Sequence, residues 1–407
     1  MNSRAFSATL VGILLIPLVS VMYLYSQSRD FLVVARFSDH PIILLIKPFL
    51  IFMPLREFPN GYRAVAQPGL TACRIACVVL FPTLLYLANR ATTYSMGPLR
   101  AGIVAAGSAM LAGGLSDVIG EAVTLYRLLS LTEGDLSSAF SISHWQGDGR
   151  YLGFFIGLFA FLIYSLAFVN ARRAARVNGA LPSSTADVCV RDVGKHGKRI
   201  AVFSTMPLLV LLLLGGVNQF TSILVDYTPL EVYSWFGTLG RRIFYENHLR
   251  LAPPVIPRDP GDLLNLPFPK INLVDVWFVP ALNSLIMIFT LWLMLSFVLS
   301  RVSLISTISA PAVFALGWSI TVLAGSAAGI ARAATRQLVS PFGEQPLLHP
   351  SISYTPPDPS LSNFFEEIPW SIIRAMQFPS IWGWLVGIAL LISYRNSVSL
   401  ARQGLSK

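Results

Sequence analysis

Charged side chains are scarce in this chain. They make up 12% of its 407 residues, about half the share found in an ordinary soluble domain, whereas hydrophobic residues make up 54%. A chain of this composition has too few charges to cover a soluble globule of its size. The composition therefore indicates a membrane protein before any motif is considered.

The residues of redox and metal chemistry are also rare. Of the three cysteines, Cys73 and Cys77 are four residues apart in one apolar span, so they share a helix face but do not point at each other as a disulfide requires. The five histidines are scattered, and neither H-E-x-x-H nor C-x-x-C occurs. A P-loop, a nucleophile elbow and a dinucleotide fingerprint are absent too. The sequence therefore predicts no disulfide framework, no metal site and no cofactor.

What the chain does have is long apolar runs. A bilayer core about 30 Å thick requires about 20 apolar residues of helix, and helices satisfy their backbone groups internally. The alternating strands of a membrane β-barrel do not appear. The predicted spans are Ala8–Tyr25, Gly69–Ala88, Ala101–Leu115, Tyr151–Val169, Ile200–Val217, Val276–Leu299, Leu304–Ala328 and Pro379–Tyr394.

The first of these spans could belong to a signal peptide, because Arg4 precedes the apolar run Ala8–Tyr25. A small-x-small cleavage pattern does not follow; the chain continues as SQSRD from Ser26 to Asp30. We therefore interpret the run as a retained first helix, with a signal peptide as the alternative.

The distribution of basic residues predicts which loops lie on which side. With a cytoplasmic N-terminus, the inner segments contain 14 of the 30 Lys and Arg residues but two of the 20 acidic residues. This excess follows the positive-inside rule, so the high pI reports topology and does not indicate nucleic-acid binding. The basic run Arg172–Arg176 is expected to meet anionic lipid headgroups. The inner segments are 1–6, 89–100, 171–199, 300–303 and 395–407.

The predicted outer loops, 26–68, 118–150, 218–275 and 329–378, are much longer than tight connections. One part of them, Leu361–Phe378, places its apolar side chains on one helix face with two glutamates opposite. This pattern predicts an amphipathic helix that lies on the outer surface or against a partner, or else packs on the protein's own spans.

Small residues recur at equivalent points of the spans. The run LAGGL at Leu111–Leu115 matches LLGGV at Leu213–Val217 and LAGSA at Leu323–Ala327. Likewise, G-x-x-x-G at Gly153–Gly157 matches Gly383–Gly387. Small residues let helices approach closely, which alone explains their presence, but the recurrence also favours a 4+4 internal duplication in parallel orientation.

The segment Gly261–Asp275 (GDLLNLPFPKINLVD) leads into the sixth span. It resembles the second catalytic motif of bacterial lipoprotein signal peptidases, where an extended V-V-D-F segment precedes F-N-x-A-D at the outer end of the last helix. Asp262 then matches the upstream Asp, Asn272 the Asn and Asp275 the catalytic Asp. The family's four helices, with a long outer loop after the first, also match half of this chain. The resemblance implies an aspartyl endopeptidase that acts on membrane-tethered lipoprotein substrates.

The family's partner motif, G-G-x-x-x-N-x-x-D-R, is matched less well. Gly215–Thr221 (GGVNQFT) has the glycines and an asparagine, but no Asp at the second carboxylate position. In the other half, Gly113–Gly120 (GGLSDVIG) places Asp117 near the Asn position and Gly120 near the Asp position.

An aspartyl peptidase needs two carboxylates that share a proton. The alternative for each carboxylate here is a solvated side chain at a helix end, because all of them lie near the predicted water boundary. The candidate catalytic pairs are Asp117 with Asp148 and Asp226 with Asp275.

Together, these patterns predict an all-α polytopic membrane protein with about eight transmembrane helices in four hairpins and large extracytoplasmic loops. Residues 1–175 would form the first four-helix unit, 176–198 a basic cytoplasmic linker and 199–407 the second unit. The absence of an N-x-[ST] sequon favours a bacterial inner membrane. The charge distribution predicts that both termini are cytoplasmic.

Three functions are compatible with this organisation. The leading interpretation is a non-catalytic scaffold, assembly or partner-binding subunit that acts through its outer loops on an envelope or membrane protein, in contact with membrane lipids. The alternative is a signal-peptidase-like aspartyl peptidase. A transporter or channel component is third, because charged residues other than Arg74 are absent from the predicted spans.

Overall fold

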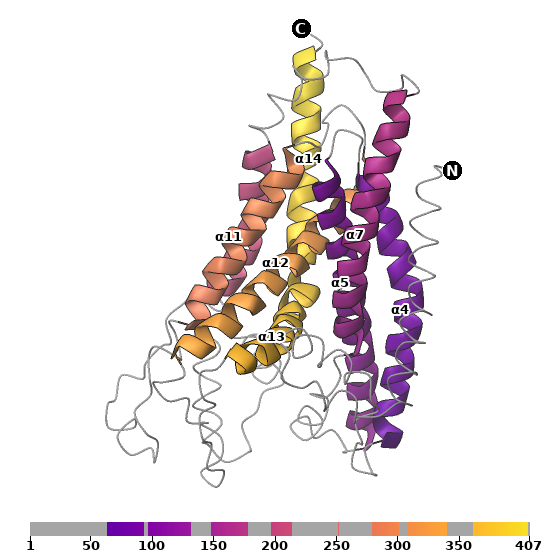
Figure 1. Cartoon of the computed structure of the whole chain (residues 1–407), viewed down its shortest axis with the longest axis vertical. Helices are drawn as coiled ribbons and strands as arrows, with labels where there is room; N and C mark the ends of the chain where they lie inside the picture. The colour runs from indigo at the N-terminus through magenta and orange to yellow at the C-terminus, as the bar shows by residue number, and fades with distance from the viewer. Residues whose placement is uncertain are drawn as a thin grey trace.

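The computed structural model of the chain describes residues 63–92, 97–131, 148–177, 197–213, 251, 279–300, 308–339 and 361–405. All regular secondary structure in these residues is helical, which confirms the predicted all-α class. The first predicted span and most of the predicted outer loops lie outside the described residues. The helices are α4 (Arg63–Ala91), α5 (Pro98–Leu131), α7 (Asp148–Val177), 197–213, α11 (Val279–Leu299), α12 (Ala310–Val339), α13 (Leu361–Trp382) and α14 (Trp384–Leu405) (Figure 1).

Several helices have the length and composition of membrane spans. Within the described residues, five are long and apolar enough to cross a bilayer: α4, α5, α7, α11 and α12. The bent pair α13–α14 adds a sixth if it counts as one span. The described part of the chain is therefore all-helical, with the build of a multi-pass membrane protein.

Two of the predicted span boundaries are wrong in an instructive way. The third span was expected to end at Leu115, but α5 continues to Leu131, so Asp117 lies inside a helix and not at its end. The eighth span was expected as one helix, whereas the structure has two helices that meet at Gly383 with a bend of 53°. Apolar composition alone does not show where polar side chains extend a helix or where a backbone bends.

Helices α5 and α12 form the centre of the molecule. About three quarters of the residues in each apolar window are buried, against fewer than half in α4, α7 and α11. They cross where the Oγ atoms of Ser108 and Ser319 lie 3.1 Å apart. A Cβ atom at Gly107 would lie 2.6 Å from the carbonyl oxygen of Ser319, so this crossing requires a glycine.

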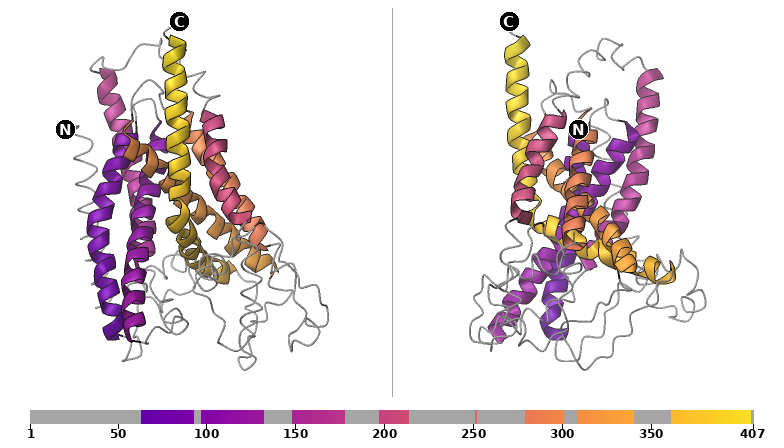
Figure 2. Two further views of the ribbon diagram at one scale, coloured as in Figure 1. Left: turned by 180° about the vertical axis from the view of Figure 1, so that it is seen from behind. Right: turned by 90° about the vertical axis from the view of Figure 1, so that its left-hand side faces the viewer.

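The other helices pack around this central pair (Figure 2). Helices α4 and α7 flank α5, while α11 and α13–α14 flank α12. Side chains of both groups share one buried cluster, in which Ala101 and Phe168 join Leu291 and Leu316. The two predicted units are thus packed directly against each other in the structure.

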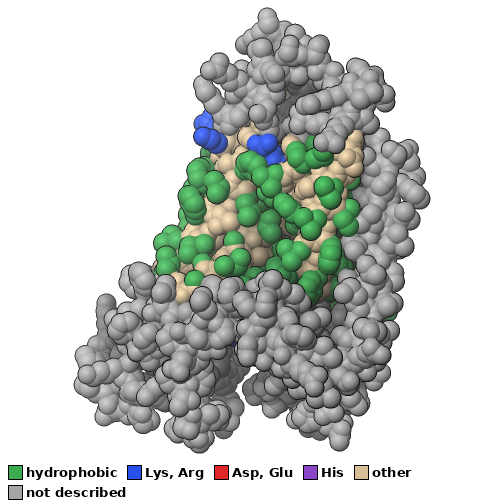
Figure 3. All heavy atoms as spheres, in the orientation of Figure 1, with side chains coloured by type: hydrophobic (Ala, Val, Ile, Leu, Met, Phe, Trp, Pro, Cys, Tyr) green, Lys and Arg blue, Asp and Glu red, His purple; other side chains and the backbone are tan. Residues whose placement is uncertain are grey.

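Several helix ends that the charge distribution predicts to lie on one side of the membrane are close together at one end of the bundle. Arg100, at the start of α5, donates from Nε to the carbonyl oxygen of Phe297 near the end of α11 (2.7 Å). The start of helix 197–213 lies there too, since a Cβ atom at Gly197 would be 3.1 Å from the carbonyl carbon of Leu299. Below this end, exposed apolar side chains cover the described surface (Figure 3).

Candidate functional site

The site is built around Asp117, a carboxylate that is 2% exposed in the interior of α5. The Nε atom of Arg150, in the first turn of α7, donates to its Oδ2 at 2.7 Å. The backbone N–H groups of Gly149 and Arg150 donate to its Oδ1 and Oδ2 at 2.7 and 3.1 Å. Asp117 therefore caps the N-terminus of α7 from a different helix, where a negative charge also complements the helix dipole.

Glycines bring the two helices close enough for this cap. A Cβ atom at Gly113 would lie against the carbonyl oxygen of Gly149 and 2.6 Å from the Cα atom of Gly153. A Cβ atom at Gly149 would in turn be 2.8 Å from Asp117 Oδ1. The small residues that the sequence singled out for helix packing thus also position the carboxylate.

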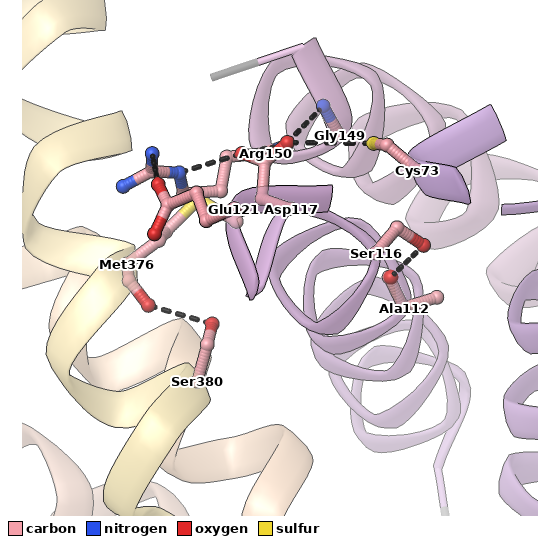
Figure 4. Close-up of polar contacts among 9 residues, drawn as sticks. All are labelled: Cys73, Ala112, Ser116, Asp117, Glu121, Gly149, Arg150, Met376 and Ser380. Atoms are coloured by element: carbon pink, nitrogen blue, oxygen red, sulfur yellow. Dashed lines mark hydrogen bonds and ion pairs between the residues drawn. The ribbon is translucent and has the colours of Figure 1, made fainter. Parts of the chain in front are cut away.

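Two further side chains complete the polar cluster (Figure 4). The Nη2 atom of Arg150 donates to Glu121 Oε1 at 3.1 Å, so Arg150 bridges two carboxylates that lie one turn apart on α5. The Cys73 thiol, on α4, lies 3.6 Å from Asp117 Oδ1. Arg150 and Glu121 extend toward Met376 of α13, which places the cluster where α4, α5, α7 and α13 meet.

The side chains of the other three predicted catalytic residues lie outside what the structure describes. Asp148 is the first residue of α7, but its side chain lies outside what the structure describes. Asp226 and Asp275 also lie outside the described residues. Both predicted carboxylate pairs therefore stay predictions.

The chemistry of the Asp117 cluster is that of a fixed anion. A general acid or base needs a carboxylate that can exchange a proton with substrate or water. Both oxygens of Asp117 instead accept from a guanidinium or from backbone amides, in a site with almost no exposure. Such an arrangement holds the two helices together through charge-assisted hydrogen bonds.

Sequence reasoning missed Arg150 and Glu121. A signal for both was present, because Glu121 follows Asp117 by one helical turn and Arg150 stands at the start of the next apolar span. A buried carboxylate needs a cation, and Arg150 is a basic residue directly before the next apolar span.

A second polar junction lies at the bend between α13 and α14. The indole Nε1 of Trp318, on α12, donates to the carbonyl oxygens of Pro379 and Ser380 at 3.0 and 3.2 Å. Gly383 still donates its N–H to Pro379 at 2.8 Å. The Pro379 and Ser380 carbonyl oxygens at the bend therefore accept hydrogen bonds from the protein itself.

Within the part of the chain that the structure describes, no group of three His, Cys, Asp or Glu side chains could hold a metal ion. Cys73 and Cys77 are buried, and neither forms a disulfide with another described residue. Comparisons of the chain with protein-family models, curated proteins and solved structures found no match.

Proposed function

We propose that this chain is a non-catalytic scaffold or assembly subunit of a bacterial inner membrane. Both termini lie in the cytoplasm, and the outer loops bind an envelope or membrane protein partner. The observation that carries this proposal is the state of Asp117. It is the one predicted catalytic residue whose side chain the structure describes, and it is neutralised by Arg150 in a helix cap.

The packing of the central helices supports the same proposal. Gly107, Ser108 and Ser319 bring α5 and α12 into direct contact along the core of the bundle. Carriers place ionisable groups or unsatisfied broken helices near the membrane midplane. Here the Trp318 indole donates to two backbone carbonyl oxygens at the bend between α13 and α14, which favours a static platform over a transport route.

The finer architecture of the proposal is a duplicated pair of four-helix units in four hairpins. If Gly113 of α5 is aligned with Gly325 of α12, then Gly107 aligns with Ser319. These two equivalent residues are in contact at the helix crossing, as a two-fold axis between the units would require. Glycines also bring neighbouring helices together in both units, because Gly153 packs on Gly113 and Gly387 packs on Gly317, although these two pairs occupy different positions in this alignment.

The test is an affinity purification of the full-length protein from native membranes. One segment of each predicted outer loop (26–62, 132–147, 218–250 or 340–360) is replaced in turn by a Gly/Ser linker of equal length. The matched control replaces 178–196, which is predicted to be cytoplasmic. We expect a membrane or envelope protein to co-purify with the wild type and the control, and to be lost with at least one outer replacement.

The opposite result is also defined. The scaffold proposal would be contradicted by a partner-free protein that cleaves a lipopeptide with turnover. This activity should then be lost in Asp117→Asn or Asp275→Asn variants that still fold. That outcome would establish the signal-peptidase-like alternative.

A further inference from the structure

Basic residues from two distant parts of the chain meet at the end of α11. Arg100 donates from Nε to the Phe297 carbonyl oxygen at 2.7 Å and from a terminal nitrogen to Ser300 Oγ at 3.4 Å. Its guanidinium carbon also lies 4.0 Å from the centre of the Phe297 ring. Gly197 packs on the same turn, which brings the following residues, Lys198 and Arg199, to this end of the bundle.

Lys198 and Arg199 present their charges outward. Both side chains are exposed, whereas Gly197, Ile200 and Ala201 beside them are buried against the bundle. Within the described residues, no carboxylate forms an ion pair with either of them. Their positive charge is therefore available to a ligand that approaches from the membrane side of helix 197–213.

An apolar strip continues from these charges along the same face of the helix. Val202, Phe203 and Met206 are all exposed, with Phe203 at 57%. They follow Arg199 at the three-, four- and seven-residue spacing that keeps side chains on one helical face. Lys and Arg side chains likewise border the apolar surface in Figure 3.

We propose that this face binds one anionic glycerophospholipid. The headgroup phosphate pairs with Lys198 and Arg199, and an acyl chain lies along Val202, Phe203 and Met206. Arg100 acts as a positioning residue, since it holds the end of α11 beside the basic pair. The charges alone would suit any anion, whereas a lipid combines an anionic group with an acyl chain that can cover the exposed apolar strip. This site does not depend on the proposed partner binding.

The experiment measures lipid binding to the purified full-length protein in detergent by native mass spectrometry. The probes are palmitoyl-oleoyl phosphatidylglycerol and the zwitterionic phosphatidylcholine with the same chains. We expect phosphatidylglycerol to bind at least tenfold more tightly. The double variant Lys198→Gln/Arg199→Gln should bind phosphatidylglycerol about 30-fold more weakly, as expected for the loss of two basic side chains near an anionic headgroup.

The matched control is Arg74→Gln/Arg374→Gln, which removes two exposed basic residues near the opposite end of the bundle. It should leave phosphatidylglycerol binding unchanged. Phe203→Ser tests the apolar strip and should weaken phosphatidylglycerol binding while the basic pair is intact.

Three outcomes would overturn the proposal. One is equal binding of the two lipids by the wild type, which needs no variant. Another is an equal loss of binding in the two double variants, which would indicate diffuse surface charge. The third is displacement of phosphatidylglycerol by millimolar inorganic phosphate or glycerol phosphate, which would indicate a site for a free anion.

Discussion

Asp117 and Arg150 are opposite charges that the bundle buries together. Removing one partner of such a pair leaves the other charge without compensation in an apolar environment. We expect Asp117→Asn to lower the free energy of unfolding in detergent by about 3 kcal/mol, because the buried Arg150 would lose its ion pair with Asp117. The measurement is thermal unfolding of the full-length protein.

The control for this prediction is Arg74→Gln, which removes an exposed charge one residue from Cys73. A double-mutant cycle then isolates the pair. Asp117→Asn combined with Arg150→Met should be less destabilising than the sum of the single changes. Strictly additive effects would show that the two side chains do not stabilise the fold as a pair.

Asn283 of α11 presents the opposite situation. Its side chain is 1% exposed, and among the described residues neither Oδ1 nor Nδ2 has a hydrogen-bond partner. Burying an unsatisfied amide is unfavourable, so Asn283→Leu should raise the free energy of unfolding by about 1 kcal/mol. Thermal unfolding measures this change. Ser284→Ala is the control, because that hydroxyl already donates to Pro280 and its loss should not stabilise the protein.

At the residue scale, the sequence identified Asp117 but not its environment. The apolar run stops at Leu115, so a hydropathy argument places the next carboxylate at the water boundary. The burial of Asp117 depends on Arg150 and on the amides of α7, which come from a different helix. Pairing between helices leaves no periodic pattern, which is why the predicted solvated or catalytic roles did not anticipate a helix cap.

The junction of α13 and α14 shows what element-scale patterns can and cannot provide. The amphipathic pattern correctly predicted a helix from Leu361 onward and left open what its apolar face contacts. In the structure, Ile372, Ile373 and Met376 are buried in the protein's own core. The bend at Gly383 was not predicted, although Pro379 and Gly383 are residues at which helices commonly bend; the Trp318 indole of α12 adds a contact that the local sequence does not show.

Trp318→Phe tests this explanation of the bend. The variant keeps an aromatic ring but removes the donor to the Pro379 and Ser380 carbonyl oxygens. We expect a loss of about 1 to 2 kcal/mol in stability, concentrated at the junction. Hydrogen–deuterium exchange should rise in peptides that cover 376–390 and stay unchanged in α5 and α7.

Trp292→Phe on α11 provides the comparison for that measurement, because Trp292 contacts the Phe289 ring and is also partly buried. It should leave exchange at 376–390 unaltered. If both variants raise exchange equally, the bend is stabilised by general packing and the indole donor has no specific role.

At the scale of the whole molecule, the two predicted units meet through α5 and α12, so we expect them to associate without a covalent link. The segment 178–196 between them contains two basic and two acidic residues and no long apolar run, and the helix that follows it begins against the end of α11. Chains cut in this segment and co-expressed as 1–187 and 188–407 should therefore assemble in the membrane. An affinity tag on one half should recover the other.

Contact between small side chains at the crossing is the physical basis of that assembly. Gly107→Leu places a side chain where even a Cβ atom would be 2.6 Å from the Ser319 carbonyl oxygen, so recovery of the second half should fall several-fold. Gly97→Leu is the matched change outside the interface, where a Cβ atom would meet only the end of the Arg100 side chain at 3.7 Å. Recovery that is insensitive to Gly107→Leu would mean that the units associate through other helices. The alignment of equivalent residues at the crossing would then be a consequence of packing and would not support duplication.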